Sequence, residues 1–402
     1  MISVSQALQI VKAYSPAPEC CAVPLEKALG SVLAKDLYSD ILMPPFDRAT
    51  MDGYAFRAAD VSTPNASLRV IGESGAGRGF GGIVGPGEAV RIMTGARVPQ
   101  GADCVQMVEK TRDSANQVVI LEPVETGKNI ASAGSEVGAG DKLEAGRYIG
   151  SSVLAVLASF GAAAVTVFRP RRVALLVTGD ELVDVAMRPG PDQIRNSNAY
   201  SLMAQIRSCG IEPAYLGVAP DREELLRPKL EQAASHEISI ATGGVSMGKY
   251  DLVAGILKEI GATIHFDRVA IKPGKPLTFA TRGNNLFFGL PGNPVSSFVA
   301  FEVFVRPVLA HLMGKKGSLA EITALFSGSF SNRGPRDYYG PARTRWNGRH
   351  WETEILKTRG SADIFRFSAA DSLAVLPAES DFRSGAEVRV LLLSDYLERV
   401  TS

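Results

Sequence analysis

The sequence predicts a multidomain protein of the α/β plus β class, in which a doubly wound, mostly parallel sheet is flanked by smaller β-rich units. Three observations predict this architecture. The 402 residues correspond to two or three domains at about 150 residues per domain. Continuous apolar strands alternate with helices after residue 171, which is typical of a parallel sheet. Short β-rich runs separated by glycine turns lie on both sides of this region.

The composition excludes several classes of protein. Apolar residues make up 46% and charged residues 21%, which is too apolar for a disordered chain. The 40 glycines and 23 prolines follow no fixed period, so the chain is not collagen-like. The net charge of +1 gives no global field that would attract nucleic acid or an anionic membrane. We therefore expect neither as a partner.

The cysteines and the N-terminus indicate a cytoplasmic protein. Cys20, Cys21, Cys104 and Cys209 are too few for a disulfide framework and lack the spacing of a zinc site. The adjacent pair Cys20-Cys21 is interpreted as two ordinary thiols, with a redox pair as the alternative. The opening segment MISVSQALQI lacks the basic and apolar regions of a signal peptide.

The N-terminal half predicts a helix followed by a small β unit. Residues 3–14 place apolar side chains at helical spacing after a serine cap. Residues 66–150 form short β-rich runs with glycine turns. The uncharged stretch 151–168 predicts a short buried helix, a turn at Gly161 and a strand. A membrane span is the alternative for this stretch, but it would need about 20 strongly apolar residues.

The C-terminal half predicts the α/β sheet and then a small barrel or sandwich. The strands RRVALLV, AYLGVA, ISIATGG and LFFGL alternate with helices expected at 197–209, from about 221, from about 250, and over 295–312. After residue 318 the pattern becomes β-rich, with a hairpin turn at Asn347-Gly348.

The carboxyl ends of the parallel strands predict a binding site, because ligands of open α/β sheets bind beyond that edge. The loops 178–181, 220–221, 242–251 and 291–296 follow the four strands. Glycine-rich turns that lead into helices can cradle an anion with their backbone N–H groups. Plain tight turns are the alternative, but two such loops beside a basic loop favour a phosphate-type ligand.

The basic loop 268–276 is predicted to hold an oxyanion or a phosphate. Two prolines and a glycine stiffen the backbone around Lys272 and Lys275, which is unusual for a solvated charged turn. A lysine ammonium suits a compact anion because it acts as a point charge.

Acidic residues from different loops predict a divalent cation beside such an anion. Glu181, Asp221 and Asp251 follow three strands of the sheet, and carboxylates next to phosphate imply Mg²⁺. Helix N-capping is the alternative for Asp221 and Asp251. In the N-terminal half, Asp52 lies beside Gly53 in a run flanked by aromatic residues, and a turn acid is its simpler explanation.

Six motifs carry a resemblance to a known family. They are FDRATMDGYAF, MTGARVPQGADCV, TGDEL, TGGVSMGKYD, IKPGKP and GLPGNPVSS. In this order they resemble the signatures of the MoeA family of molybdopterin molybdenumtransferases, which is similar to the E domains of gephyrin and of its plant counterpart. The resemblance covers about residues 3–395. TGGVSMG alone also fits molybdopterin adenylyltransferases, but the flanking β units argue against those smaller proteins.

The resemblance implies a fold and an activity. The activity is insertion of molybdate into adenylylated molybdopterin with release of AMP, with Mg²⁺ as cofactor and molybdate as substrate. It implies a homodimer with the site between chains, and other molybdenum-cofactor biosynthesis proteins as a class of partner. Four domains are expected: an elongated N-terminal and linker domain (1–45 and 140–170, its first helix packed on the α/β domain), a small mostly-β domain (46–139), a three-layer α/β molybdopterin-binding domain (171–316) and a C-terminal β-barrel-like domain (317–402).

The resemblance also implies roles for single residues. The catalytic residues would be Asp52, Glu181, Asp221, Asp251, Lys272 and Lys275, with Glu181, Asp221 and Asp251 as metal ligands. The substrate-binding residues would be Thr94, Glu136, Gly243, Gly244, Ser246, Gly248, Arg268, Pro291, Gly292, Asn293, Pro294, Ser296, Arg336 and Ser361.

Three positions depart from the family pattern. Glu136 stands where Asp is expected, Arg268 where some members have Lys, and Pro341 where Arg is common, although Arg343 is close. These departures leave room for a paralogue that prefers tungstate. The chain could also be a non-catalytic carrier or scaffold that binds the pterin, or a generic nucleotide-binding protein.

Overall fold

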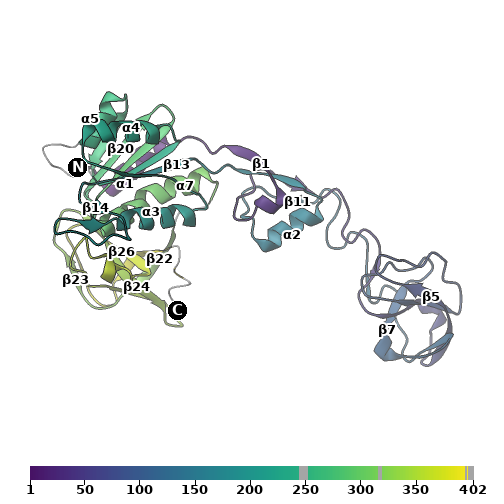
Figure 1. Cartoon of the computed structure of the whole chain (residues 1–402). Helices are drawn as coiled ribbons and strands as arrows, with labels where there is room; N and C mark the ends of the chain where they lie inside the picture. Colours follow the sequence, from purple (N-terminus) through teal and green to yellow (C-terminus); the bar gives the residue numbers. More distant parts are fainter. Residues whose placement is uncertain (244–251, 316–318, 394–395, 397–402) are drawn as a thin grey trace. The chain divides into compact units, whose positions relative to one another are not determined.

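The computed structural model in Figure 1 describes residues 1–243, 252–315, 319–393 and 396. The chain divides into two compact units. The first unit comprises Met1–Ala34, Gly146–Gly150 and Val165–Ser402, and the second comprises Lys35–Ala145 and Ser151–Ala164. The N-terminal segment therefore belongs to the same unit as the α/β sheet.

The first unit contains the predicted doubly wound sheet. Its six strands have the order β16-β13-β17-β21-β20-β18. The first four are parallel to one another, and β20 pairs antiparallel with both of its neighbours, β21 and β18. The strands are β13 (Val173–Thr178), β16 (Ala214–Ala219), β17 (Ile238–Thr242), β18 (Thr263–Arg268), β20 (Pro276–Arg282) and β21 (Asn285–Leu290).

Helices cover both faces of this sheet and give the expected three layers (Figure 1). Neighbouring residues of one strand enter different cores, because successive side chains point to opposite faces. Leu175 belongs to the core shared with α1, α3, α6 and α7, whereas Leu176 belongs to the core shared with α4 and α5. The helices are α1 (Val4–Tyr14), α3 (Ser197–Ser208), α4 (Glu223–Ala234), α5 (Leu252–Glu259), α6 (Pro294–Ala300) and α7 (Arg306–Leu312).

The first helix begins where the sequence predicts it. Ser3 caps α1, and its hydroxyl accepts a hydrogen bond from the backbone of Gln6, whose side chain in turn accepts one from the backbone of Ser3. This capping box satisfies two N–H groups that a helix otherwise leaves unpaired. Val4, Ala7 and Val11 then bury the helix against the α/β core.

The helix predicted over 295–312 contains a π-helical turn. Between α6 and α7 lies η4 (Phe301–Val305), so the helix runs from Pro294 to Leu312. This helix is long and apolar enough to cross a membrane, but it is mostly buried inside the first unit. Phe301 and Phe304 are completely buried in the core. Its apolar character is thus explained by its place in the core.

The C-terminal part of the first unit is a closed barrel. The strands follow the order β24-β25-β22-β28-β26, and pairing of β24 with β26 closes the circle. Asn347-Gly348 lies in the turn between β24 and β25, as predicted. The barrel strands are β22 (Ala320–Phe326), β24 (Asp337–Trp346), β25 (Trp351–Ile355), β26 (Ser372–Leu376) and β28 (Glu387–Leu392). The short elements nearby are β23 (Phe330–Asn332), β27 (Ser380–Phe382) and α8 (Ile364–Phe367).

A short strand of the α/β region joins the barrel. Strand β19 (Ile271–Lys272) pairs in parallel with the start of β24, with Lys272 opposite Tyr338. This edge of β24 is open there, because β25 pairs only with residues 342–346. The remaining short elements of this unit are β1 (Cys20–Pro24) paired with β12 (Ala164–Phe168), β14 (Leu182–Val183) paired with β15 (Ile194–Arg195), and the 3₁₀ turn η1 (Leu25–Lys27).

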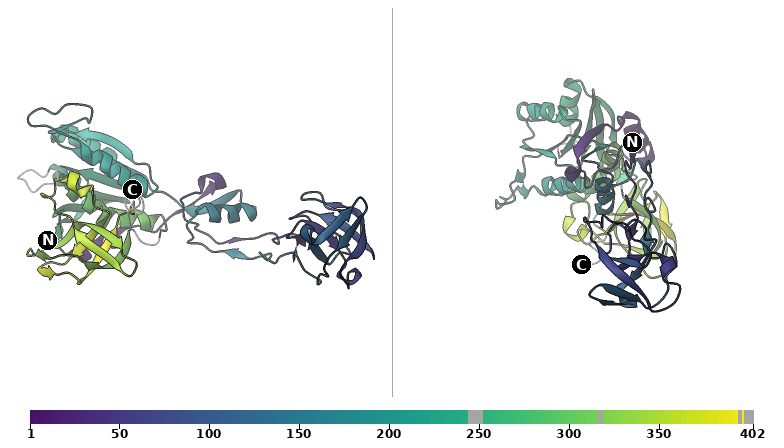
Figure 2. Two further views of the ribbon diagram at one scale, coloured as in Figure 1. Left: turned by 90° about the horizontal axis from the view of Figure 1, so that it is seen from below. Right: turned by 90° about the vertical axis from the view of Figure 1, so that its right-hand side faces the viewer.

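The second unit is built on a six-stranded sheet with the order β7-β4-β6-β5-β9-β8. Figure 2 shows these dark blue strands gathered in one body in both views. They are β4 (Gly53–Phe56), β5 (Ala66–Ser74), β6 (Glu88–Ile92), β7 (Cys104–Met107), β8 (Thr111–Ser114) and β9 (Gln117–Ile120). The other elements are β2 (Leu37–Tyr38) paired with β11 (Lys142–Leu143), β3 (Arg48–Ala49) paired with β10 (Ile130–Ala131), η2 (Ala58–Asp60), η3 (Val108–Lys110) and α2 (Ser151–Ser159).

The uncharged stretch 151–168 forms the predicted helix, turn and strand. Helix α2 ends before Gly161, which has a φ of 75°, and β12 follows. The expected burial of the helix is wrong, because only Leu157 of its nine residues is buried. Its small residues therefore reflect a partly exposed short helix, and the membrane alternative is not supported.

The backbone after β17 comes very close to the end of β13. Gly243, directly after β17, has a φ of 90°, and a Cβ atom there would lie 2.1 Å from the carbonyl oxygen of Thr178 at the end of β13. Only glycine avoids both the unfavourable conformation and the collision. The two loops at this edge are close because residue 243 has no side chain.

We predict that Gly243→Ala destabilises the chain by at least the roughly 1–3 kcal/mol that such a backbone conformation costs, because the collision adds to the strain. The measurement is the urea midpoint of the full chain. Gly255→Ala is the matched control, because Gly255 lies inside α5 with open space around its Cα. That change should be neutral or stabilising by up to about 1 kcal/mol. Equal effects of the two substitutions would contradict the close approach.

Candidate functional site

The loops after β13, β17 and β21 line one cavity of about 580 Å³, which we call the loop pocket. It lies at the carboxyl edge of the parallel strands, where the sequence predicts a ligand. The predicted residues that line it are Glu181, Gly243, Pro291, Gly292, Asn293 and Pro294. Its volume lies in the range of small-molecule sites, about 300–1,000 Å³.

A buried hydrogen-bond network holds two of these loops together. The Nδ2 of Asn198, on α3, donates to the carbonyl oxygen of Gly292 at 2.8 Å and to Oγ1 of Thr242 at 3.1 Å. The hydroxyl of Thr242 donates to the carbonyl oxygen of Pro291 at 2.9 Å. These contacts fix the loop after β21 against the end of β17. The sequence reasoning missed Asn198, whose only signal was its place in the first turn of a helix after a predicted strand.

The loop after β21 leads directly into a helix N-terminus. Asn293 is the N-cap of α6 and Pro294 its first residue. Proline suits this position because its missing N–H would be unpaired there in any case. The helix N-terminus adds partial positive charge beside the pocket, which favours an anionic ligand.

A second cavity of about 600 Å³, the lysine pocket, adjoins the loop pocket. Asn293 and Pro276 line both cavities, so the two are neighbours. The predicted residues that line the lysine pocket are Lys272, Lys275, Asn293, Ser296, Arg336 and Ser361. The structure therefore distributes the predicted basic and glycine-rich loops over two adjoining cavities rather than one.

The lining of the lysine pocket is strongly cationic. Lys272, Lys275, Arg336 and Arg359 contribute positive charges, and no carboxylate lines the pocket among the residues that the structure describes. Surplus positive charge in a concave site attracts anions and holds them. Pro341, one of the departures from the family pattern, also lines this pocket.

Contacts with the barrel position the basic loop 268–276, which carries Lys272 and Lys275 and which we call the lysine turn. The Nζ of Lys272 lies 5.2 Å from the ring centroid of Tyr338, which stacks on Phe330 with 5.1 Å between centroids. A cation over an aromatic face is attracted by the ring quadrupole. Arg336 donates from Nη1 to the carbonyl oxygen of Ile271 at 3.3 Å. The sequence reasoning missed Tyr338 and Phe330, which are far from the lysines in the chain.

A loop of the barrel also closes on the N-terminus of α6. Asn293 Nδ2 donates to Ser361 Oγ at 2.9 Å, and the backbone N–H of Val295 donates to the carbonyl oxygen of Ser361 at 3.0 Å. Ser361 thus connects the barrel to the loop shared by both pockets. The two cavities share a wall that is fixed from both sides.

Acidic side chains gather at the ends of β13 and β16. The backbone N–H of Asp221 donates to Oδ1 of Asp180 at 3.2 Å. Partial burial raises the pKa of the Asp221 carboxyl, and the negative charges of Asp180 and Glu181 raise it further. Asp221 is not a side-chain cap, since α4 is capped by Arg222 without a side-chain hydrogen bond.

The metal site is not complete in the part of the chain that the structure describes. No group of three His, Cys, Asp or Glu side chains is arranged there to hold a metal ion. Glu181 lines the loop pocket, whereas Asp221 lines neither cavity. Gly244, Ser246, Gly248 and Asp251 lie within 244–251, outside the described residues.

The predicted residues of the second unit form two separate contacts. Thr94 donates to Oδ1 of Asp52 through its backbone N–H at 2.6 Å and through its hydroxyl at 2.7 Å. These hydrogen bonds hold the pKa of the exposed Asp52 carboxyl below its usual range. Glu136 forms an ion pair with Arg48. The unit therefore presents an ionised carboxylate with a fixed hydroxyl beside it.

Arg268 is the one predicted substrate-binding residue of the described α/β region that lines neither pocket. It lies at the end of β18, with its Nε 3.8 Å from a carboxylate oxygen of Asp267. Its backbone carbonyl accepts a hydrogen bond from Ile2.

Known proteins resemble this chain over nearly its whole length. Residues 2–161 match the family described as MoeA N-terminal region (domain I and II), and residues 174–311 match the probable molybdopterin binding domain. A molybdopterin molybdenumtransferase of Bacillus subtilis (strain 168) is 33% identical over 98% of this chain and 94% of its own. One of Nostoc sp. is 36% identical over 92% of this chain and 88% of its own.

A solved structure agrees with these relatives. The crystal structure of the molybdopterin biosynthesis MoeA protein from Pyrococcus horikosii matches with a TM-score of 0.82 and 32% identity. The match covers 98% of this chain and 99% of that one. The chain therefore belongs to the molybdopterin molybdenumtransferase family, a family of transferases in molybdenum cofactor biosynthesis.

Proposed function

We propose that this chain inserts molybdate into adenylylated molybdopterin and releases AMP. The observation that carries the proposal is the lysine pocket, a cationic cavity without a described carboxylate that adjoins the glycine-rich loop pocket. The proposed substrates are a compact oxyanion and a pterin that carries phosphates, and two adjoining anion sites suit this pair.

In this proposal the loop pocket binds the pterin and its phosphates, and the lysine pocket binds molybdate. Backbone N–H groups of the loop after β21 and the N-terminus of α6 would hold a phosphate. Lys272, Lys275 and Arg336 would neutralise the oxyanion, and Ser361 would accept or donate one hydrogen bond. The chain then acts by placing the two substrates together and by stabilising negative charge, without a covalent intermediate.

We predict that Lys275→Gln lowers the rate of molybdate transfer by about 10²–10³-fold, the usual effect of removing one electrostatic contact to a developing charge. The measurement is AMP release by the full chain with molybdate, Mg²⁺ and adenylylated molybdopterin. Lys258→Gln, on the exposed surface of α5, is the charge-matched control and should keep full activity.

The same assay separates the enzyme from a carrier. Tight binding of the pterin without AMP release would support a non-catalytic carrier instead. Normal transfer by the Lys275→Gln variant would contradict the assignment of the lysine pocket. Tungstate offered in place of molybdate tests whether the chain prefers tungstate, the alternative that the departure at Pro341 leaves open. Pro341 lines this pocket.

We further propose that the reaction depends on Mg²⁺ held near Glu181 and Asp221. The repulsion that raises the pKa of Asp221 supports this, because a divalent cation would relieve it. Mg²⁺ is commonly held by one or two carboxylates together with substrate phosphates, so two protein ligands suffice. When bound, the cation would neutralise charge on the phosphoanhydride that is cleaved.

We predict that Asp221→Asn stabilises the metal-free chain at neutral pH. The folded-state pKa of Asp221 is raised, so its ionised form costs stability above that pKa. The gain should disappear as the pH falls below the usual aspartate range of about 3.9, where the group is protonated in both states. The measurement is the free energy of unfolding in urea, for the wild-type chain and the variant, at neutral pH and at a pH below about 3.9.

Addition of MgCl₂ provides the second half of this test. At neutral pH it should stabilise the wild-type chain by mass action and have little effect on the Asp221→Asn variant. Equal stabilisation of both proteins, or of neither, would contradict a cation site at Asp221.

We also propose a homodimer in which a second copy of the chain supplies Asp52 and Thr94 to the pockets. Support comes from the exposed, ionised Asp52 that Thr94 fixes in the second unit. A carboxylate held in one orientation on a surface suits contact with a substrate across an interface.

We also propose a cytoplasmic location, which the free thiols of all four cysteines support.

We predict that mixing two inactive variants restores activity if sites form between chains. Asp52→Ala and Lys275→Gln would be unfolded and refolded together in equal amounts. About a quarter of the wild-type activity should return, because half of the dimers are mixed and each has one intact site. Activity no higher than that of the separate variants, with mixed dimers demonstrated by mass spectrometry, would contradict the shared site.

A further inference from the structure

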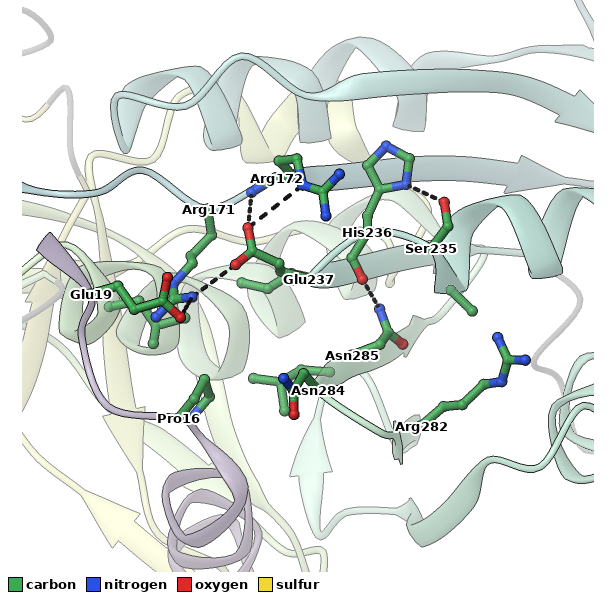
Figure 3. Close-up of a pocket in the computed structure, with 14 residues that line it drawn as sticks. Pro16, Glu19, Arg171, Arg172, Ser235, His236, Glu237, Arg282, Asn284 and Asn285 are labelled. Carbon is green, nitrogen blue, oxygen red and sulfur yellow. Dashed lines mark hydrogen bonds and ion pairs between the residues drawn. The ribbon is translucent and has the colours of Figure 1, made fainter. Parts of the chain in front are cut away.

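A separate cavity of about 370 Å³ lies at the opposite edge of the α/β sheet, where the parallel strands begin. Arg172 immediately precedes β13, Glu237 immediately precedes β17, and Asn285 begins β21. Figure 3 shows these side chains around the cavity, with Arg282 and Asn284 of the hairpin between β20 and β21. We call this cavity the arginine pocket; it shares no lining residue with the loop or lysine pockets.

One wall of the arginine pocket is an ion cluster that neutralises itself. Glu237 accepts hydrogen bonds from Arg169 at 2.6 Å, from Arg171 at 2.8 Å and from the backbone N–H of Arg172 at 2.9 Å. Glu19 accepts from Arg169 and Arg171 as well, and Figure 3 shows its contact with Arg171. Burial alone would raise the pKa of Glu237, but these partners lower it to about 2. Two glutamates and two arginines thus balance each other.

Two further arginines add positive charge that these two glutamates do not neutralise. Arg172 has a side chain that is 70% exposed, and its Nε lies 3.9 Å from Glu237, at the limit of an ion pair. Arg282 donates from Nε to the carbonyl oxygen of Ile260 at 2.8 Å and forms no ion pair with any described carboxylate. Arg172 and Arg282 therefore both line the cavity with little compensation of their charge. Figure 3 shows them on different sides of His236 and Asn285.

The frame around these two arginines is rigid. Asn285 is buried, and its Nδ2 donates to the carbonyl oxygen of His236 and to Oγ of Ser239, both at 2.8 Å. Asn285 pairs with Arg282 across a two-residue turn, so the backbone of Arg282 is held by the sheet. A fixed backbone lowers the entropy that the arginine side chains lose when a ligand binds.

We propose that the arginine pocket binds a small anion of the phosphate class, separate from the substrates of the transfer reaction. Guanidinium groups match phosphate oxygens in planar, paired hydrogen bonds. Asn284 and Ser235 at the same cavity offer neutral hydrogen bonds to the rest of the ligand. A cavity of this size holds a phosphate together with a small organic group.

The location gives such binding a structural effect. Pro16 and Glu19 lie in the segment that leads into β1, and Arg171 follows β12, the partner of β1. A ligand in the arginine pocket would contact both segments and the beginning of the sheet together. Binding should therefore raise the thermal stability of the first unit.

The test is calorimetric titration of inorganic pyrophosphate into the full-length Lys272→Gln/Lys275→Gln variant, in which the lysine pocket no longer competes for the probe. We expect a saturable site in addition to any phosphate binding by the loop pocket, which this variant leaves intact. Adding Arg172→Gln and Arg282→Gln should weaken it at least about tenfold, the usual effect of losing charged hydrogen bonds. Adding Arg349→Gln and Arg383→Gln, which remove the same charge from exposed positions, should leave it unchanged.

Three results would overturn the proposal. These are no saturable binding in the lysine-pocket variant, equal weakening by both arginine pairs, or binding of a polyglutamate peptide without binding of pyrophosphate. The Arg172→Gln/Arg282→Gln change in an otherwise natural chain should retain molybdate transfer, so this test does not depend on the proposed function. The melting temperature should rise with pyrophosphate in the chain that keeps both arginines and not in the chain that lacks them.

Discussion

The docking of the lysine turn between two sheets is the constraint on which the proposed site depends. On one side, the backbone N–H of Val269 donates to the carbonyl oxygen of Lys275 at 3.0 Å, which closes the loop between β18 and β20. On the other side, β19 adds to the open edge of β24 in the barrel. Residues of the α/β sheet and of the barrel, such as Leu277 and Val375, belong to one core. The lysine pocket forms only when the α/β sheet and the barrel pack together.

Positive and negative side chains lie in different places around the carboxyl edge of the α/β sheet. The lysine pocket carries cations from the turn and from the barrel, whereas Asp180, Glu181 and Asp221 gather at the ends of β13 and β16. This arrangement suits a substrate that presents an oxyanion on one side and phosphates with a cation on the other. Asn293 belongs to both cavities and is fixed by Ser361. Asn293 therefore lies at the boundary between the two cavities.

The sequence predicts the elements of the fold better than their junctions. The doubly wound sheet follows from continuous apolar strands, which only a sheet buried on both faces requires. The capped helix after Ser3 and the turn at Asn347-Gly348 follow from local rules of capping and turn chemistry. The barrel closure and the addition of β19 to β24 depend on residues far apart in the chain, and no local pattern encodes them.

The same distinction applies to the sites. Glycine-rich loops and the lysine turn carry signals within a few residues, so the sequence alone can predict that they bind a ligand, and this stays a prediction. Their division between two cavities was not predictable, since it depends on how the barrel packs. Asn198 and Tyr338 support these loops from distant elements. The arginine pocket has no sequence motif, because Arg172, Glu237 and Asn285 meet only at the edge that the parallel strands share.

The most direct test of the account is anomalous X-ray diffraction at the molybdenum edge, from crystals of the full chain grown with molybdate. We predict an anomalous peak in the lysine pocket, with the oxygen atoms of the bound oxyanion about 3 Å from polar atoms of Lys272, Lys275 and Arg336. A molybdenum peak elsewhere on the chain, with the lysine pocket holding none, would contradict it.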